Sequence, residues 1–153
     1  MNISVIPART LVCLIALLVL SAVGSAWIVA PPCVANETLK QAMSQMDDAL
    51  KVLSKGVTAE NRVASLEELA KFQAAVLSAK AHTPESAAKV EEKKRAAFVG
   101  DFRKTLVEGL QFSCATEVAI IVGKYKEADT LIRNKISALK STGHGKFKPA
   151  EAK

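Results

Sequence analysis

Few side chains in this sequence have types and places that suit chemistry. The 153 residues include two histidines, three methionines and three cysteines. His82 stands two residues before Pro84, which indicates a loop, so His144 is the candidate imidazole and Met43 and Met46 are the candidate thioethers. Imidazole nitrogen and thioether sulfur are ligands of transition metals, and one of each on opposite sides of an iron leaves no open position for oxygen. Such a site suits electron transfer rather than catalysis.

Other kinds of chemistry have little support in the sequence. No Ser-His-Asp arrangement, paired carboxylate site, phosphate-binding loop or zinc-ligand spacing stands out, and the chain is therefore expected not to be an enzyme. The acidic pairs at 47–48, 67–68 and 91–92 are typical of solvated helix faces. No Cys-x-x-Cys-His sequence is present, so covalent haem attachment is not encoded. Cys114 lies in an apolar stretch and is predicted to be a small buried residue.

The composition predicts a helical protein. Ala, Leu, Lys, Glu and Val are abundant, only 5% of the residues are aromatic, and the chain has seven glycines and five prolines. The net charge is +6 at pH 7, but most basic residues are spread among acidic ones. A nucleic-acid-binding surface usually gathers basic residues together with aromatic ones, so nucleic acid is not an expected partner.

Apolar spacing predicts four amphipathic helices, over residues 37–53, 60–81, 98–121 and from 125 toward 147. Residues 85–95 are charged and lack an apolar stripe, which favours a linker. The expected fold is all-α, an antiparallel up-down-up-down four-helix bundle. The stripes predicted to face inward are Leu39, Met43, Met46, Leu50 and Leu53; Val63, Leu66, Leu69, Phe72, Val76 and Ala79; Phe98, Phe102, Leu106, Leu110, Cys114, Val118 and Ile121; and Ala128, Leu131, Ile132, Ile136 and Leu139.

The first 35 residues have the pattern of a secretory signal peptide. Arg9 precedes an apolar run over 11–30, and no acidic residue occurs before Glu37. Small residues at Cys33 and Ala35 favour cleavage before Asn36, which would leave one domain over 36–153 and place it in the periplasm. Two alternatives stay open, namely cleavage after Ala26 and an uncleaved membrane anchor, because about twenty apolar residues can span a bilayer.

The predicted bundle brings Met43 and His144 to the same end of the molecule. In an up-down-up-down arrangement the start of the first helix lies beside the end of the fourth, so side chains far apart in sequence can face each other there. Taken alone, a methionine on a helical stripe is usually core filling, and a histidine in a polar C-terminal segment is usually solvated. The placement needs a second argument before it indicates a site.

A resemblance supplies that argument. Residues 42–52 (AMSQMDDALKV), 71–75 with 80–84 (KFQAA and KAHTP), 101–103 (DFR) and 123–128 (GKYKEA) together resemble the four helices of the cytochrome b562 family over 36–148. That family implies a soluble periplasmic b-type cytochrome, an up-down bundle that binds one non-covalent haem b per chain. It also implies a monomer that transfers electrons to redox partner proteins, with no membrane association unless the leader is retained.

The resemblance also assigns residues to the haem site. Met43 matches the family's methionine ligand and His144 its histidine ligand, while Met46, one turn deeper, is the alternative thioether. The chain needs about one extra residue before His144 compared with the family, and Gly143 and Gly145 flank it. The haem-lining positions of the family fall on Met46, Leu50, Phe72, Phe102 and Leu106. Lys140 and Lys148, on either side of His144, are placed to face the haem propionates.

Two other functions remain open at this stage. The first is a haem-free helical bundle with an interaction or envelope-stress role, since a domain of about 118 residues can fold without a cofactor. The second is a haem-storage or haem-sensing protein that uses the same ligands. Redox chemistry with tightly held haem distinguishes a carrier from both.

Overall fold

The computed structural model describes residues 38–147, so the predicted leader and Lys148 lie outside the described residues. All regular secondary structure in this part of the chain is helical, which confirms the all-α prediction. Four main helices follow one another, with a short 3-10 helix, η1, between the second and third. Their bounds are α2 (Leu39–Leu53), α3 (Arg62–Lys80), η1 (Glu85–Lys89), α4 (Glu92–Ile121), and a last helix made of α5 (Tyr125–Leu131), the π-helical η2 (Ile132–Ile136) and α6 (Ser137–Phe147).

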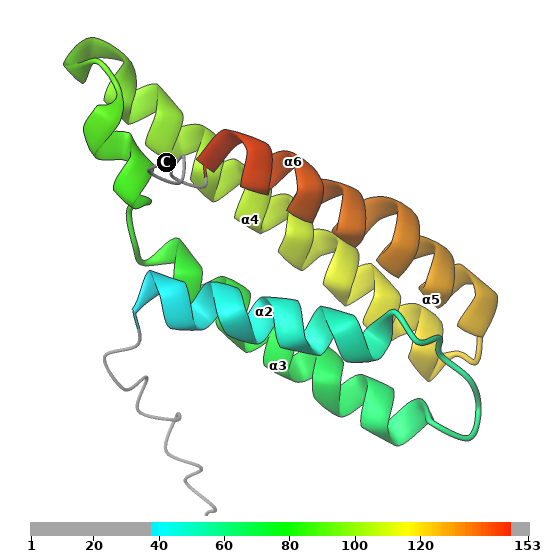
Figure 1. Cartoon of the computed structure of the whole chain (residues 1–153). Helices are drawn as coiled ribbons and strands as arrows, with labels where there is room; N and C mark the ends of the chain where they lie inside the picture. Colours follow the sequence, from blue (N-terminus) through cyan, green and yellow to red (C-terminus); the bar gives the residue numbers. More distant parts are fainter. Residues whose placement is uncertain (1–37, 148–153) are drawn as a thin grey trace, which may run out of the picture. The chain divides into compact units, whose positions relative to one another are not determined.

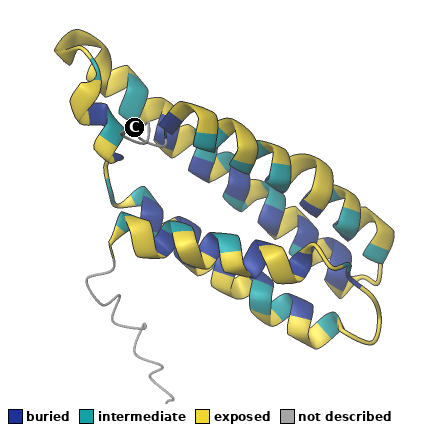
Figure 2. Ribbon diagram, viewed as in Figure 1, coloured by how far each residue is buried: buried dark blue, intermediate teal, exposed yellow. Residues whose placement is uncertain are grey.

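The helices pack as neighbours in the order of the chain. Figure 1 shows α2 beside α3, and α4 beside the last helix, while α3 also contacts α4. The buried residues lie on the faces that the helices turn toward one another, as Figure 2 shows. None of the helices among residues 38–147 is long and apolar enough to cross a membrane.

Local signals in the sequence explain where α2 begins and where α2 and α4 end. Thr38 and Gln41 form a capping box at the start of α2, in which the Gln41 N–H donates to Thr38 Oγ1 at 3.3 Å and the Thr38 N–H donates to Gln41 Oε1 at 2.8 Å. Gly56 and Gly123, in the turns that follow α2 and α4, have positive φ angles of 109° and 78°. Glycine reaches this region without the strain that a Cβ brings.

The core largely follows the predicted stripes in α2 and in the middle of α3. Met46, Leu50 and Leu53 are buried in α2, and Leu69 and Phe72 are buried in α3. Burial of each such side chain contributes about 1.5–3 kcal/mol to folding. The remaining core residues from these two helices are Ala42, Ala49, Ala75, Val76 and Ala79.

The predicted register is wrong at the start of α3 and in the second half of α4. Val63 is 70% exposed, Val118 is 59% exposed and Ile121 is 52% exposed, and Cys114 is an exposed free thiol rather than a buried one. The predicted α4 stripe advanced four residues at a time. Because an α-helix has 3.6 residues per turn, each such step drifts about 40° around the axis, and the apolar side chains leave the core face.

Small and hydroxyl residues occupy the true core face of α4. The buried positions are mostly separated by alternating steps of four and three residues. The later ones include Gly109, Ser113, Thr116 and Ile120. Ser113 Oγ donates to the Leu110 carbonyl and Thr116 Oγ1 to the Phe112 carbonyl, both at 2.8 Å. These bonds satisfy the hydroxyl groups within the helix itself, so the residues can be buried without a partner from another helix.

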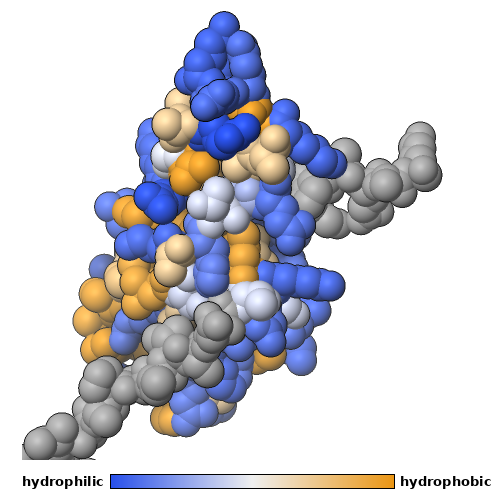
Figure 3. Space-filling view, turned by 90° about the vertical axis from the view of Figure 1, so that its left-hand side faces the viewer, coloured by the Kyte–Doolittle hydropathy of each residue, from blue (hydrophilic) through white to orange (hydrophobic). Residues whose placement is uncertain are grey.

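The charged segment 85–95, predicted as a linker, is mostly helical. It contains η1 and the first turn of α4, which begins at Glu92 rather than near Phe98. Arg95 Nε donates to the Ala87 carbonyl at 3.1 Å and one terminal nitrogen of Arg95 donates to the Val90 carbonyl at 3.4 Å, so one side chain holds the turn closed. Figure 3 shows a hydrophilic surface at the top of the molecule, where this segment lies in Figure 1. The charged side chains lie at a solvent-exposed helix start, and for this reason the segment has no apolar stripe.

Replacement of two glycines by alanine, one inside α4 and one after it, should change the free energy of unfolding in opposite directions. Gly123→Ala should lower the free energy of unfolding by about 1 kcal/mol or more, because alanine is strained at a φ of 78°. Gly100→Ala should raise it by about 0.5–1 kcal/mol, since Gly100 is exposed inside the helix and an added Cβ meets nothing within 4 Å. Urea unfolding measures both. Equal effects of the two substitutions would contradict the α4 boundary.

Candidate functional site

An apolar groove of about 690 Å³ lies among the four main helices. Its size is within the range of cofactor and ligand pockets. Helix α2 contributes Leu39, Met43, Met46 and Leu50 together with the polar Lys40, Ser44 and Asp47; α3 contributes Phe72 and Val76; the start of η1 contributes Pro84 and Glu85; α4 contributes Phe102, Thr105, Leu106 and Gly109; and the last helix contributes Ile136, Leu139, Lys140, Gly143, His144 and Phe147. All seven residues predicted for the site, Met43, His144, Met46, Leu50, Phe72, Phe102 and Leu106, therefore line this one groove.

Helix α2 supplies both candidate thioethers. Met43 and Met46 are three residues apart, so they lie on neighbouring turns of one helix face. Met46 is only 7% exposed and belongs to the buried core, whereas Met43 is partly buried and packs against the edge of that core. Met43 is thus the more exposed residue of the two.

The candidate imidazole comes from the last helix. His144 is partly buried, lies in α6 and lines the groove together with Gly143 on one side and Phe147 one turn later. Gly143 and Gly145 do not interrupt this segment, since residues 137–147 form one continuous helix. The second histidine, His82, lies in the turn after α3 and does not line the groove.

Phe147 anchors the end of α6 and was not among the predicted site residues. Its ring packs edge to face against Phe98 and Phe102, with ring centroids 5.2 Å and 5.3 Å apart. Ser86 Oγ also donates to the Phe147 carbonyl at 2.6 Å. The sequence signal for this anchor was present, because Phe147 ends the apolar pattern of the last helix. The position holds His144 close to α4.

Ion pairs connect α6 to the helices on either side. Lys140 Nζ lies 3.0 Å from Asp47 Oδ1 on α2, and both residues line the groove. Lys146 Nζ lies 2.6 Å from Asp101 Oδ2 on α4 and, by donating to that carboxylate, holds the pKa of Asp101 below its usual value. Partly exposed pairs of this kind contribute at most about 1 kcal/mol each, so they orient the rim of the groove more than they stabilise the fold. Without a ligand, Lys140 thus has Asp47 as its partner.

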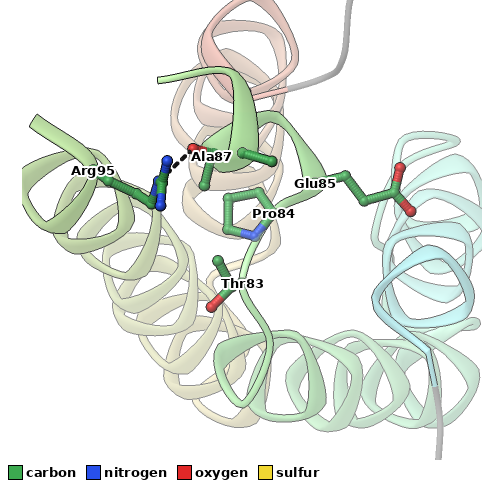
Figure 4. A pocket seen from close by; sticks show the side chains of 6 residues that line it. Thr83, Pro84, Glu85, Ala87 and Arg95 are labelled. Carbon is green, nitrogen blue, oxygen red and sulfur yellow. Dashed lines mark hydrogen bonds between the residues drawn. The ribbon is translucent and has the colours of Figure 1, made fainter. Parts of the chain in front are cut away.

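A second hollow, of about 380 Å³, lies beside the turn after α3 and is much more open. Thr83, Pro84, Glu85, Ala87 and Arg95 line it, as Figure 4 shows. The Arg95 guanidinium is the strongest binding group here, but it already donates to the Ala87 and Val90 carbonyls. This hollow is a by-product of the η1 turn rather than a candidate binding site.

The donor set of the main groove fits haem better than a bare metal ion. Among the described residues no three or more His, Cys, Asp or Glu side chains gather where they could hold an ion. The groove instead offers the His144 imidazole on the last helix and the Met43 and Met46 thioethers on α2, in a lining that is mainly apolar. An added Cβ at Gly109 meets nothing within 4 Å, so the groove has open space beside α4. Such a lining fits a flat, mainly apolar group with an iron at its centre.

Comparison with known proteins adds no family to this picture. No protein-family model matches the chain, and no curated protein matches it significantly.

Proposed function

We propose that this protein is a b-type cytochrome that binds one non-covalent haem b in the groove and transfers electrons in the periplasm. In this proposal the four helices form an antiparallel up-down-up-down bundle, and Met43 and His144 are the axial ligands of the iron. The observation that carries the proposal is that all seven residues assigned from the sequence line a single apolar groove. They come from all four main helices, so the groove brings together positions that are far apart in the sequence.

The lining residues account for the properties that such a site needs. Phe72 and Phe102 are 5% and 4% exposed and form apolar walls, which exclude water from the cofactor. The half-buried position of Met43 at the groove favours it over Met46, which is 7% exposed and belongs to the buried core. Iron bound between a thioether and an imidazole has a raised reduction potential and exchanges electrons without binding oxygen.

The charge of the chain bears on its partners. The net charge of +6 favours encounter with acidic redox proteins, since opposite charges steer association. Lys140 lies on the rim of the groove, where exchange of its Asp47 partner for a haem propionate would cost little. The proposed protein is a monomer, exported by a signal peptide over residues 1–35.

Titration of the purified full-length protein with haem tests the proposal. We expect saturation at one haem per chain, a low-spin spectrum in the oxidised state, and sharp α and β bands after reduction. Repeated oxidation and reduction should leave the haem bound, which distinguishes a carrier from a haem-storage or haem-sensing protein. A spectrum no different from that of free haem would refute the proposal.

A haem-free interaction role is the second candidate, and one observation favours it. Val63, Val118, Ile121 and Val122 are each more than half exposed, and Arg62 at the start of α3 donates to the Ile121 carbonyl at 3.1 Å, so these apolar side chains lie near one end of the bundle. Exposed apolar residues that gather in one area are typical of contact surfaces. Substitution of Val118 by Lys should abolish partner binding in this case.

A further inference from the structure

The last helix contains one turn that is wider than an α-helical turn. Residues Ile132–Ile136 form a π-helix between α5 and α6. Ser137 Oγ donates to the Ile132 carbonyl at 3.0 Å, so the carbonyl at the start of this turn has a hydrogen-bond donor. A π turn holds one residue more than an α turn, so it shifts every later residue around the helix axis, and such turns occur often at functional sites.

The π turn separates two parts of the last helix that do different things. Ala128, which precedes the π turn, and Ile132, which begins it, are fully buried in the core. Every residue of this helix that lines the groove lies at Ile136 or later. The change from core packing to groove lining therefore coincides with the π turn.

The position of His144 depends on this extra residue. In an unbroken α-helix each residue advances about 100°, so His144, twelve residues after Ile132, would lie about 120° away from it around the axis. With one residue absorbed in the π turn, His144 lies within about 20° of Ile132, which is fully buried. The same shift explains why the sequence shows about one extra residue before His144.

We infer that the π turn at Ile132–Ile136 is the device that sets the register of α6 and turns His144 toward the groove. This inference takes the role of His144 as an iron ligand from the proposed function, but the register itself is independent of haem. Asn134 is the exposed middle residue of the turn. It acts by adding length to the backbone, and its side chain is not required.

A matched deletion and insertion in the full-length protein test the inference. Deletion of Asn134 should convert the π turn to an α turn and leave residues 137–147 in place. Haem affinity should then stay within about threefold of wild type, and the melting temperature should not fall. Insertion of one alanine after Asn134 should rotate His144 and Phe147 by about 100°. Haem should then bind at least about 10–100-fold more weakly, and the melting temperature should drop because Phe147 leaves the core.

A compensating substitution distinguishes a shift of helix register from simple loss of folding. In the inserted chain the place of His144 is taken by residue 143, so Gly143→His in that background should restore the low-spin spectrum. If the deletion removes haem binding, or if the inserted chain binds haem as wild type does, the inference is overturned. If wild type binds no haem, the proposed function falls, yet the melting temperatures of the two haem-free variants still decide the register. Equal melting temperatures would overturn the register inference in that case.

Discussion

His144→Ala is expected to abolish the low-spin haem spectrum and to weaken haem binding at least about 10–100-fold. His144 is the histidine that lines the groove, so in the proposed site its removal would leave Met43 as the remaining iron ligand. Iron with one protein ligand is high-spin or takes up water, and its α and β bands after reduction are broad. Visible absorption of the oxidised and reduced protein, at one haem per chain, measures the change.

His82→Ala is the matched control for this prediction. His82 is also partly buried, but it lies in the turn after α3 and outside the groove lining. Its removal should leave the spectrum and the affinity unchanged. A low-spin spectrum that persists in His144→Ala and disappears in His82→Ala would mean that haem binds elsewhere, and that the groove serves another purpose.

The helices were predictable from the sequence because local signals define them. The stripe of Met46, Leu50 and Leu53 predicted the buried face of α2, and Gly56 and Gly123 marked the turns after α2 and α4. Seven residues of the groove followed from the resemblance, because apolar spacing alone cannot distinguish a cavity wall from core filling, whereas Thr105, Gly109 and Phe147 were not assigned.

Other features were not predictable, for physical reasons. The core face of α4 contains Gly109, Ser113 and Thr116. Glycine has no side chain and the other two carry hydroxyl groups, so these positions do not form an apolar stripe in the sequence. The start of α4 was hidden by charge, since Glu92 and its neighbours face solvent on all sides. The π turn has no local sequence signature, and its only trace was the extra residue before His144.

Gly109→Leu should close the groove, and this prediction separates a haem-binding groove from an incidental gap in packing. Gly109 lies on the buried face of α4, lines the groove, and has no neighbour within 4 Å of an added Cβ. A leucine there should fill part of the space that haem would occupy and lower haem affinity by at least about tenfold, a loss of about 1.4 kcal/mol. In the haem-free protein it should raise the free energy of unfolding by about 1 kcal/mol or more, because leucine is a better helix former than glycine and its side chain gains apolar contacts.

Gly109→Ala and Gly100→Leu are the controls for this result. Gly109→Ala improves helix propensity at the same position but adds only a methyl group, so it should stabilise the fold by about 0.5–1 kcal/mol and leave haem binding nearly unchanged. Gly100→Leu places the same side chain on the exposed face of α4, where it should not affect haem. A functional groove requires haem affinity and haem-free stability to change in opposite directions only in Gly109→Leu. If this variant is more stable and still binds haem as wild type does, haem does not occupy the groove, and the open space beside Gly109 is a packing defect of a helical bundle with a different role.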